Sequence, residues 1–195
     1  MDALTLLHER NSAPKLCEPG PSGKVLSDIL KSALRSPDHA RIKPWRFLTV
    51  EAGARESLGT LFVESAKAAA ISNNSPPPSE SELEKISRQP LRAPLVIIVI
   101  AAIKEHPKVP PIEQILSAGC AAHSILLAAH ALGYAGVWRT GIHAYDQRVK
   151  SGLGLAPAEA IVGFIYLGTI DGNYKSLAEL PVEDYCESWN GPIDK

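Results

Sequence analysis

The chain has 195 residues, of which 45% are hydrophobic and 21% charged, and these proportions are typical of a globular protein with one sizeable core. Its 20 basic and 21 acidic residues give a formal net charge of -1, which argues against nucleic acid as the main partner. We therefore expect a single domain over residues 1–195, in which any basic patch is local.

Cysteine spacing and hydropathy indicate a cytoplasmic protein without a membrane anchor. Cys17, Cys120 and Cys186 are far apart and form neither a CxxC pair nor a zinc-type spacing, so reduced thiols and no metal site are expected. The first ten residues lack the apolar core of a signal peptide. The most apolar runs, 94–103 and 118–132, are shorter than the roughly 20 residues that a membrane-spanning helix needs.

The predicted elements alternate between helices and strands along the chain. Asp2 caps a first helix whose apolar face carries Leu4 and Leu7, and Ser22 begins a second helix that ends at Ser36-Pro37. Ser79 and Glu82 form a capping box for a short later helix. Helices are also expected over 54–71, 110–132 and 146–151, and strands over 45–50, 94–103, 136–139 and 160–168.

Two of these elements define the core. Residues 94–103 are apolar at nearly every position, which is typical of a strand covered on both faces. The helix over 110–132 ends at Gly133, and its small-residue-rich middle is apolar nearly all round, so we expect it to pack also against a second protomer. The order of elements indicates an α+β or α/β fold, with one sheet covered by helices.

Two polar segments lie outside the expected core. The loop over 73–79 contains three prolines and is either a lid or a disordered surface loop. Residues 171–195 are polar and marked by prolines, and we expect them to form an extended C-terminal arm that wraps a partner subunit.

The first cluster with chemical potential is Arg10-Asn11-Ser12, at the end of the first helix. A guanidinium binds phosphate through a planar fork of donors, and a nearby hydroxyl adds a hydrogen bond. The alternative is an arginine that only caps its own helix, which the helix dipole favours.

A second cluster lies between the second helix and the first long strand. Arg35 and the segment Ser36-Pro37-Asp38-His39 lead to Pro44-Trp45, and two prolines stiffen this loop. The segment offers donors, a cation and a flat aromatic ring, and the alternative, which the segment alone favours, is a plain helix-to-strand turn with a buried Trp45.

The third cluster, Trp138-Arg139-Thr140-Gly141, directly follows a predicted strand. Strand ends are common ligand positions in layered sheets, and an Arg-Thr pair suits a phosphate. A structural arginine is the alternative. Taken together, the three clusters suit a flavin mononucleotide (FMN), because they offer cations and hydroxyls for its phosphate and polar groups for its ring.

These clusters, with the strand after Arg92-Ala-Pro94 and the helical Ser117-Ala-Gly-Cys120, resemble the nitroreductase family in their order and spacing to about Thr169. The resemblance implies a three-layer α+β fold with a mixed central sheet flanked by helices. It implies FMN as cofactor, bound at two sites in a homodimer interface, and NADH or NADPH as electron donor.

The family's binding residues carry over by position. The resemblance implies FMN contacts from Arg10, Asn11, Ser12, Pro37, Trp138, Arg139 and Thr140, with Arg35 and His39 contributing across the dimer interface. It assigns the nicotinamide nucleotide to Ala128, Ala129, His130, Ala131, Leu132 and Gly133.

The chain departs from the family pattern at two positions. Asn11 stands where close relatives often have arginine, and Pro14 stands where larger members have a lysine. The group that stabilises the reduced flavin is therefore open, and Arg35 is our candidate.

The activity expected from the resemblance is hydride transfer from NAD(P)H to a nitroaromatic or quinone-like acceptor by a ping-pong mechanism. In such an enzyme the cofactor carries the chemistry and the protein binds and orients it, so no catalytic side chain or metal is required. A flavin reductase or dehydrogenase on the same fold, and a non-enzymatic flavin-binding protein, are the alternatives. The histidines are expected to be ordinary: His123 and His130 in a core or interface stripe, and His8, His106 and His143 in solvent.

Overall fold

The chain folds around one five-stranded sheet in the computed structural model, which describes residues 2–191. The strands are β1 (Leu16–Cys17), β2 (Trp45–Glu51), β3 (Leu95–Ala102), β4 (Ala135–Arg139) and β5 (Glu159–Ile170). The strand pairs are antiparallel, and β5 is the hub that pairs with β1, β3 and β4. A parallel bridge between Ser12 and Gly136 makes the sheet mixed, as expected.

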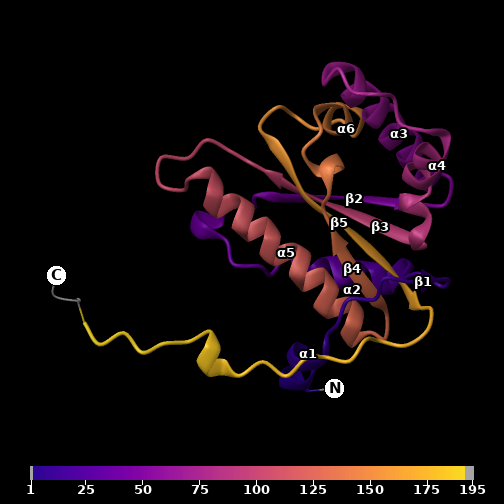
Figure 1. Cartoon of the computed structure of the whole chain (residues 1–195). Helices are drawn as coiled ribbons and strands as arrows, with labels where there is room; N and C mark the ends of the chain where they lie inside the picture. The colour runs from indigo at the N-terminus through magenta and orange to yellow at the C-terminus, as the bar shows by residue number, and fades with distance from the viewer. Residues whose placement is uncertain (1, 192–195) are drawn as a thin grey trace.

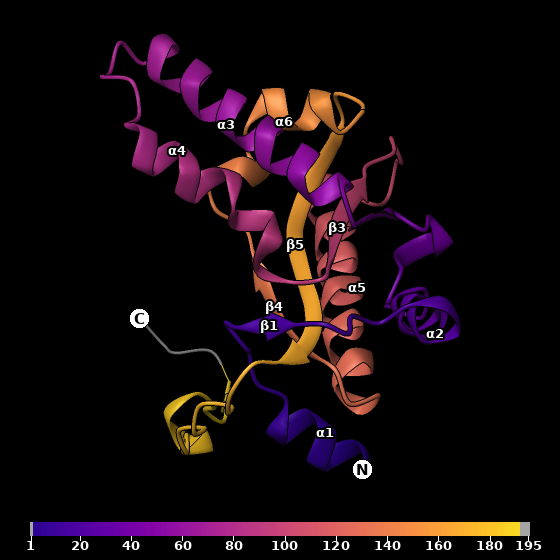
Figure 2. The same ribbon diagram turned by 90° about the vertical axis from the view of Figure 1, so that its right-hand side faces the viewer.

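Helices cover both faces of the sheet and give the expected three layers (Figure 1). The α-helices are α1 (Ala3–Glu9), α2 (Gly23–Ala33), α3 (Ala54–Ser72), α4 (Glu80–Ser87), α5 (Pro111–Ala131) and α6 (Gln147–Gly152). Helices α2 and α5 pack on one side of β3 and β5, whereas α3, α4 and α6 lie on the other (Figure 2).

The side chains of β3 point alternately to the two faces of the sheet, so they contribute to two separate core clusters. Ile97 and Val99 pack against α2 and α5, while Ile98 and Ile100 pack against α3 and α6. All four side chains are fully buried, because a strand covered on both faces has no solvent side. The prediction of a central, doubly covered strand is confirmed.

Caps and turns explain where the helices begin and end. The Asp2 carboxylate accepts hydrogen bonds from the backbone of Leu4 and Thr5, and Ser79 and Glu82 form the predicted capping box at α4. Ser22 precedes α2, but its side chain makes no capping hydrogen bond. Gly133 follows α5 with a φ of +83°, the left-handed conformation that ends a helix.

Two predictions for the N-terminal part of the chain differ from the structure. Strand β1 lies in the segment expected to be irregular, because two residues are too few to show a strand period. In the single chain the expected apolar face of α1 is exposed, with Leu4 64% and Leu7 52% exposed, and the main packing partner of α1 is α5.

Helix α5 is 21 residues long and is by length and composition apolar enough to span a membrane, so the sequence estimate of its apolar length was too short. Its packing is that of a core helix. Ala118, Ala121, Ala122 and Ile125 are fully buried against the sheet and α2. The opposite face, which includes Leu116 and Cys120, is exposed in the single chain.

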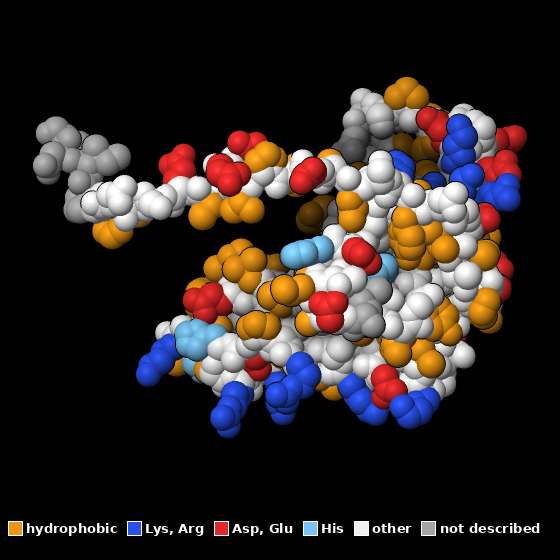
Figure 3. All heavy atoms as spheres, turned by 90° about the horizontal axis from the view of Figure 1, so that it is seen from below, with side chains coloured by type: hydrophobic (Ala, Val, Ile, Leu, Met, Phe, Trp, Pro, Cys, Tyr) orange, Lys and Arg blue, Asp and Glu red, His pale blue; other side chains and the backbone are white. Residues whose placement is uncertain are grey.

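Residues 171–190 leave the body as an exposed segment that contains only one short 3-10 turn, Val182–Asp184 (Figure 3). Its start is held to the body at two points. The side chain of Asn11 donates a hydrogen bond to the carbonyl of Lys175 at 2.7 Å, and the ring of Tyr174 meets the edge of His130 with centroids 5.9 Å apart. Residues 192–195 of the expected arm lie outside the described residues.

Candidate functional site

The site residues of β4 lie on opposite faces of the sheet, because side chains alternate along a strand. Trp138 is paired with Ile165 and packs with the α2 and α5 core, whereas Arg139 is paired with Phe164 and lines a cavity on the α3 and α4 side. Trp138 and Arg139, which are neighbours in the sequence cluster, therefore face opposite sides of the sheet. Its end, Thr140-Gly141, is exposed.

Trp138 is held in place by its own sheet. Its indole nitrogen donates a hydrogen bond to the carbonyl of Val162 at 3.3 Å. A Cβ atom on Gly163 would lie 2.0 Å from that nitrogen, so only glycine leaves room for the ring. On the α5 side, Trp138 shares a shallow apolar groove with Pro37 and Cys120, so the structure brings the predicted residues Pro37 and Trp138 together.

The Arg10-Asn11-Ser12 cluster lies at the other end of β4. Ser12 forms its bridge with Gly136, and the backbone N–H of Ala13 donates to the Gly136 carbonyl at 3.1 Å. Gly136 and Thr140 are four residue steps apart along the strand direction, a span of about 13 Å. The first and third clusters therefore flank the outer edge of one short strand.

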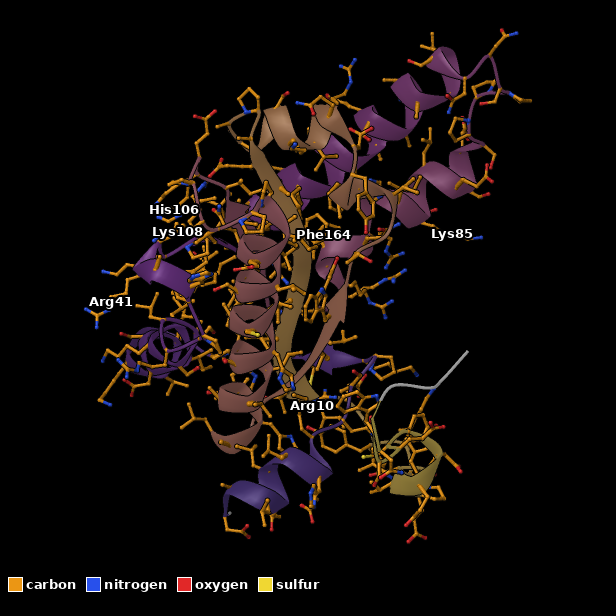
Figure 4. All side chains as sticks on the ribbon, turned by 90° about the vertical axis from the view of Figure 1, so that its left-hand side faces the viewer. Arg10, Arg41, Lys85, His106, Lys108 and Phe164 are labelled. Carbon is orange, nitrogen blue, oxygen red and sulfur yellow. The ribbon has the colours of Figure 1, made fainter. Side chains whose placement is uncertain are left out.

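Asn11 is engaged within the chain. Its amide nitrogen binds the Lys175 carbonyl, and its amide oxygen accepts the backbone N–H of Ser12 at 2.8 Å. Arg10 follows α1 at its carboxyl end, and Figure 4 labels it above α1 in the lower half of the molecule. Binding of FMN by these three residues stays a prediction.

Arg35 and His39 lie on the opposite side of α5 from the cavity. Arg35 follows α2, and His39 begins the 3-10 turn His39–Arg41. In Figure 4 the labelled Arg41 of this turn lies on one side of α5, and the labelled Lys85 of α4 lies on the other. Both side chains are exposed, and the His39 Nδ1 atom lies 2.6 Å from a carboxylate oxygen of Glu113. A single chain thus does not bring Arg35 and His39 to Arg139.

A cavity of about 500 Å³ opens beside the end of β4. Its walls come from α3, α4, the 3-10 turn Gln89–Arg92, β4, the 3-10 turn Ile142–Ala144 and β5. The lining residues are Phe62, Ile86, Gln89, Arg92, Trp138, Arg139, Thr140, Gly141, Ile142, His143, Phe164 and Tyr166. They include two arginines and no acidic residue, so the cavity is electropositive.

The pKa of Tyr166 is affected by this positive charge. Burial raises the pKa of the Tyr166 phenol, while the positive charges of Arg92 and Arg139 act in the opposite direction. Neither arginine forms an ion pair with any residue within 2–191, and the Nε atom of Arg139 is buried without a hydrogen-bond partner in that range.

His143 was expected in solvent, and that prediction is wrong. The side chain is 5% exposed and stacks on Phe62 with ring centroids 4.0 Å apart and an interplanar angle of 1°. Burial lowers the pKa of His143, although the carboxylate of Asp146 acts against this, so the neutral imidazole is favoured. Its Nδ1 atom is buried and has no hydrogen-bond partner among residues 2–191.

The stretch assigned to the nicotinamide nucleotide, Ala128–Gly133, is the last turn of α5 and the turn after it. The backbone N–H of Leu132 binds the carbonyls of Ala128 and Ala129, and Tyr174 packs on His130. Carbonyls at a helix end carry partial negative charge, which does not favour a pyrophosphate. Nucleotide binding here stays a prediction.

Sequence reasoning missed most of the cavity wall. Phe62, Gln89 and His143 come from three separate elements, Phe164 and Tyr166 come from β5, and the five share no sequence motif. Arg92 was the one available signal, because it is a cation three residues before the buried strand β3.

Comparisons with known proteins agree on one family. The model of the nitroreductase family matches residues 17–169. A relative from Escherichia coli (strain K12), provisionally named as the NAD(P)H nitroreductase YdjA, is 40% identical over 169 residues, which cover 87% of this chain and 88% of that protein. A Bacillus subtilis (strain 168) relative named in the same way, YfhC, is 26% identical over 86% of this chain and 83% of its own length.

Solved structures share the fold. A nitroreductase-like family protein from Bacillus cereus matches with a TM-score of 0.81 and 22% identity, covering 98% of this chain and 97% of that one. A nitroreductase with bound FMN from Bacteroides fragilis NCTC 9343 matches with a TM-score of 0.71 and 20% identity, covering 96% of this chain and 100% of that one.

Proposed function

The chain belongs to the nitroreductase family, and on that premise we propose that it is an FMN-dependent oxidoreductase that uses NADH or NADPH to reduce nitroaromatic or quinone-like acceptors. When bound, FMN would supply the redox chemistry, namely hydride uptake from the nicotinamide in one half-reaction and reduction of the acceptor in the next, which predicts ping-pong kinetics. We infer a cytoplasmic location, because the donor nucleotide is a cytoplasmic metabolite.

The observation that carries the proposal is the unpartnered guanidinium at the end of β4. The buried Nε atom of Arg139 lacks a hydrogen-bond partner among the described residues, and a buried donor left unpaired costs about 1–3 kcal/mol. An anionic or carbonyl-rich ligand would remove that cost. The relative with bound FMN, from Bacteroides fragilis, has the same fold, which supports FMN as this ligand.

The residues along β4 fit the two ends of FMN. Arg10 and Ser12 supply a cation and a hydroxyl at the start of the strand, and these suit a phosphate. Trp138, Arg139 and Thr140 supply backbone groups, a guanidinium and a hydroxyl at its other end, for the polar edge of the flavin ring. Asn11 would act by orienting Ser12, because its amide oxygen accepts the Ser12 backbone N–H.

The proposed active unit is a homodimer. Arg35 and His39 would reach the flavin of the partner subunit, because they lie away from Arg139 in their own chain, and Pro37 would contact FMN from beside Trp138. The exposed apolar face of α5 and the exposed leucines of α1 supply surface for such an interface. The segment from Asp171 onward would wrap the partner, and Arg35 is our candidate for stabilising the reduced flavin.

An absorption spectrum of the purified protein tests the proposal. We expect flavin bands that bleach without oxygen on addition of NADH or NADPH and return on addition of a nitroaromatic or quinone. A colourless protein that takes up no FMN would refute the proposal. Bleaching without transfer to these acceptors, with slow release of reduced FMN, would favour a flavin reductase, and bound flavin that never bleaches would favour a non-enzymatic flavin-binding protein.

A further inference from the structure

The proposed flavin contacts leave part of the cavity wall without a role. We call this part the inner pocket, and its residues are Phe62, Gln89, Arg92, His143, Phe164 and Tyr166. The cavity volume of about 500 Å³ is within the range of roughly 300–1,000 Å³ that small-molecule sites have. The inner pocket faces the same space as Arg139, so a ligand bound in it would lie beside the proposed flavin position.

Charge favours an anion in the inner pocket. Arg92 stands at its exposed side and has no ion-pair partner among residues 2–191. Arg88, one turn away on the same segment, instead pairs with Glu84 at 3.4 Å and does not line the cavity. A free guanidinium with planar, forked donors suits a carboxylate, which it can bind through two parallel hydrogen bonds.

Aromatic rings favour a flat ligand. Phe62 is stacked on His143, and Phe164 meets Phe62 edge-on with centroids 5.5 Å apart and an interplanar angle of 82°. These rings fix one another and give the pocket a rigid apolar wall. A planar aromatic ring packs against such a wall at little cost in side-chain freedom.

His143 adds a polar group to that wall. The ring lines the cavity and is 95% buried, since 5% of it is exposed, and its Nδ1 atom has no partner among the described residues. A buried polar atom without a partner in the protein marks a place where a ligand or water completes the hydrogen bonding. A neutral imidazole can supply one donor or one acceptor there.

We propose that the inner pocket binds the electron acceptor, and that the acceptor is an aromatic carboxylate held by Arg92 and contacted by His143. This assignment rests on the proposed function, because it names the substrate class of the same site. Arg92 is then the residue that selects anionic over neutral acceptors.

Equilibrium binding tests the assignment without any turnover. Calorimetry with 4-nitrobenzoate and its neutral analogue 4-nitrobenzamide, on the flavin-loaded protein without nucleotide, should give tighter binding of the carboxylate. In Arg92→Gln the carboxylate should bind roughly 10- to 150-fold more weakly, the loss expected for one charged hydrogen-bonding group. Arg92→Lys should recover part of the affinity, and Arg88→Gln, which removes a nearby exposed arginine, should keep the preference.

Kinetics and flavin content complete the test. In Arg92→Gln the ratio of kcat/KM for 4-nitrobenzoate to that for 4-nitrobenzamide should fall, because the KM for 4-nitrobenzoate rises. His143→Phe keeps the stacking on Phe62 and should also lower this ratio. An equal preference in the wild type and Arg92→Gln would overturn the assignment. So would loss of bound flavin from Arg92→Gln, because Arg92 would then hold the flavin phosphate. A wild type that selects the carboxylate but never bleaches with NADH or NADPH would refute the proposed function and leave the anion site standing.

Discussion

The imidazole of His143 lies parallel to the ring of Phe62, with the two centroids 4.0 Å apart. The stack buries a titratable group against a hydrocarbon ring in the wall of the cavity. Burial lowers the pKa of His143, so the fold favours the neutral ring, and the unfolded chain binds more protons than the native state at mildly acidic pH.

This stack predicts a pH dependence of stability. The contribution of neutral His143 is fully present above its unfolded pKa of about 6.5, and it is lost as the pH falls below that value towards the lower folded pKa. In His143→Phe we expect a smaller drop in unfolding temperature between about pH 7 and about pH 5 than in the wild type. His106→Asn, at an exposed position, is the control and should keep the wild-type drop. An unchanged drop in His143→Phe would contradict the prediction.

Arg10 and Arg139 are predicted to bind FMN from the two ends of β4. Replacing either by alanine should weaken FMN binding by about 1.5–3 kcal/mol, or roughly 10- to 150-fold, because each removes charged hydrogen bonds. The dissociation constant of FMN, measured by flavin fluorescence on the apoprotein, checks this. Arg148→Ala removes an exposed arginine of α6 and should bind FMN like the wild type. If both variants purify with full flavin, the assignment of Arg10 to the phosphate and of Arg139 to the flavin ring is wrong.

A shared site predicts complementation between two defective variants. If Arg10 acts in its own chain and Arg35 reaches the partner's flavin, a mixed dimer of Arg10→Ala and Arg35→Ala contains one intact site and one doubly defective site. Random re-pairing of equal amounts should then restore about a quarter of the wild-type sites. Flavin content and activity after unfolding and refolding the mixture measure the recovery, with each variant alone as control. No recovery would indicate that both residues act within one chain, or that the protein is a monomer.

Asn11 is predicted to hold the start of the C-terminal segment. Asn11→Ala removes the hydrogen bond to the Lys175 carbonyl, worth about 1 kcal/mol, so the segment should detach roughly five times more often. Trypsin cleavage after Lys175 should become faster by a similar factor, while cleavage after Lys85, in exposed α4, serves as the internal reference. Equal rates of cleavage after Lys175 in Asn11→Ala and the wild type would contradict this role of the hydrogen bond. The FMN affinity should fall less than in Arg10→Ala, because the side chain contacts Ser12 only at its backbone.

The elements were predictable because local signals are strong in this chain. The apolar run of β3, the capping box at Ser79 and the glycine after α5 each depend on neighbours within a few residues. Arg10 and Arg139 could be singled out as candidate ligand contacts for a similar reason, because each lies in a short polar cluster that directly follows a predicted helix or strand.

The cavity could not be predicted, since its wall depends on strand register and helix packing. Phe62 meets His143 only because α3 packs beside the turn after β4, 81 residues further along the chain than Phe62. The opposite directions of Trp138 and Arg139 follow from their pairing with Ile165 and Phe164, which no local pattern specifies.

Gly163 carries the last prediction, because it couples the sheet to the candidate site. A Cβ atom there would lie 2.0 Å from the Trp138 indole nitrogen, so Gly163→Ala must displace the ring and break its hydrogen bond to Val162. Overpacking of this kind costs about 1–3 kcal/mol. We expect a lower free energy of unfolding in urea and weaker FMN binding, because Arg139 and Thr140 directly follow the displaced residue.

Gly53→Ala is the matched control: its added Cβ meets no atom closer than 3.9 Å, and its φ of -63° suits alanine. That variant should change stability by less than about 0.5 kcal/mol. If Gly163→Ala were destabilised but bound FMN with wild-type affinity, the position of Trp138 would matter for folding alone, and the flavin contacts assigned to the end of β4 would have to be withdrawn.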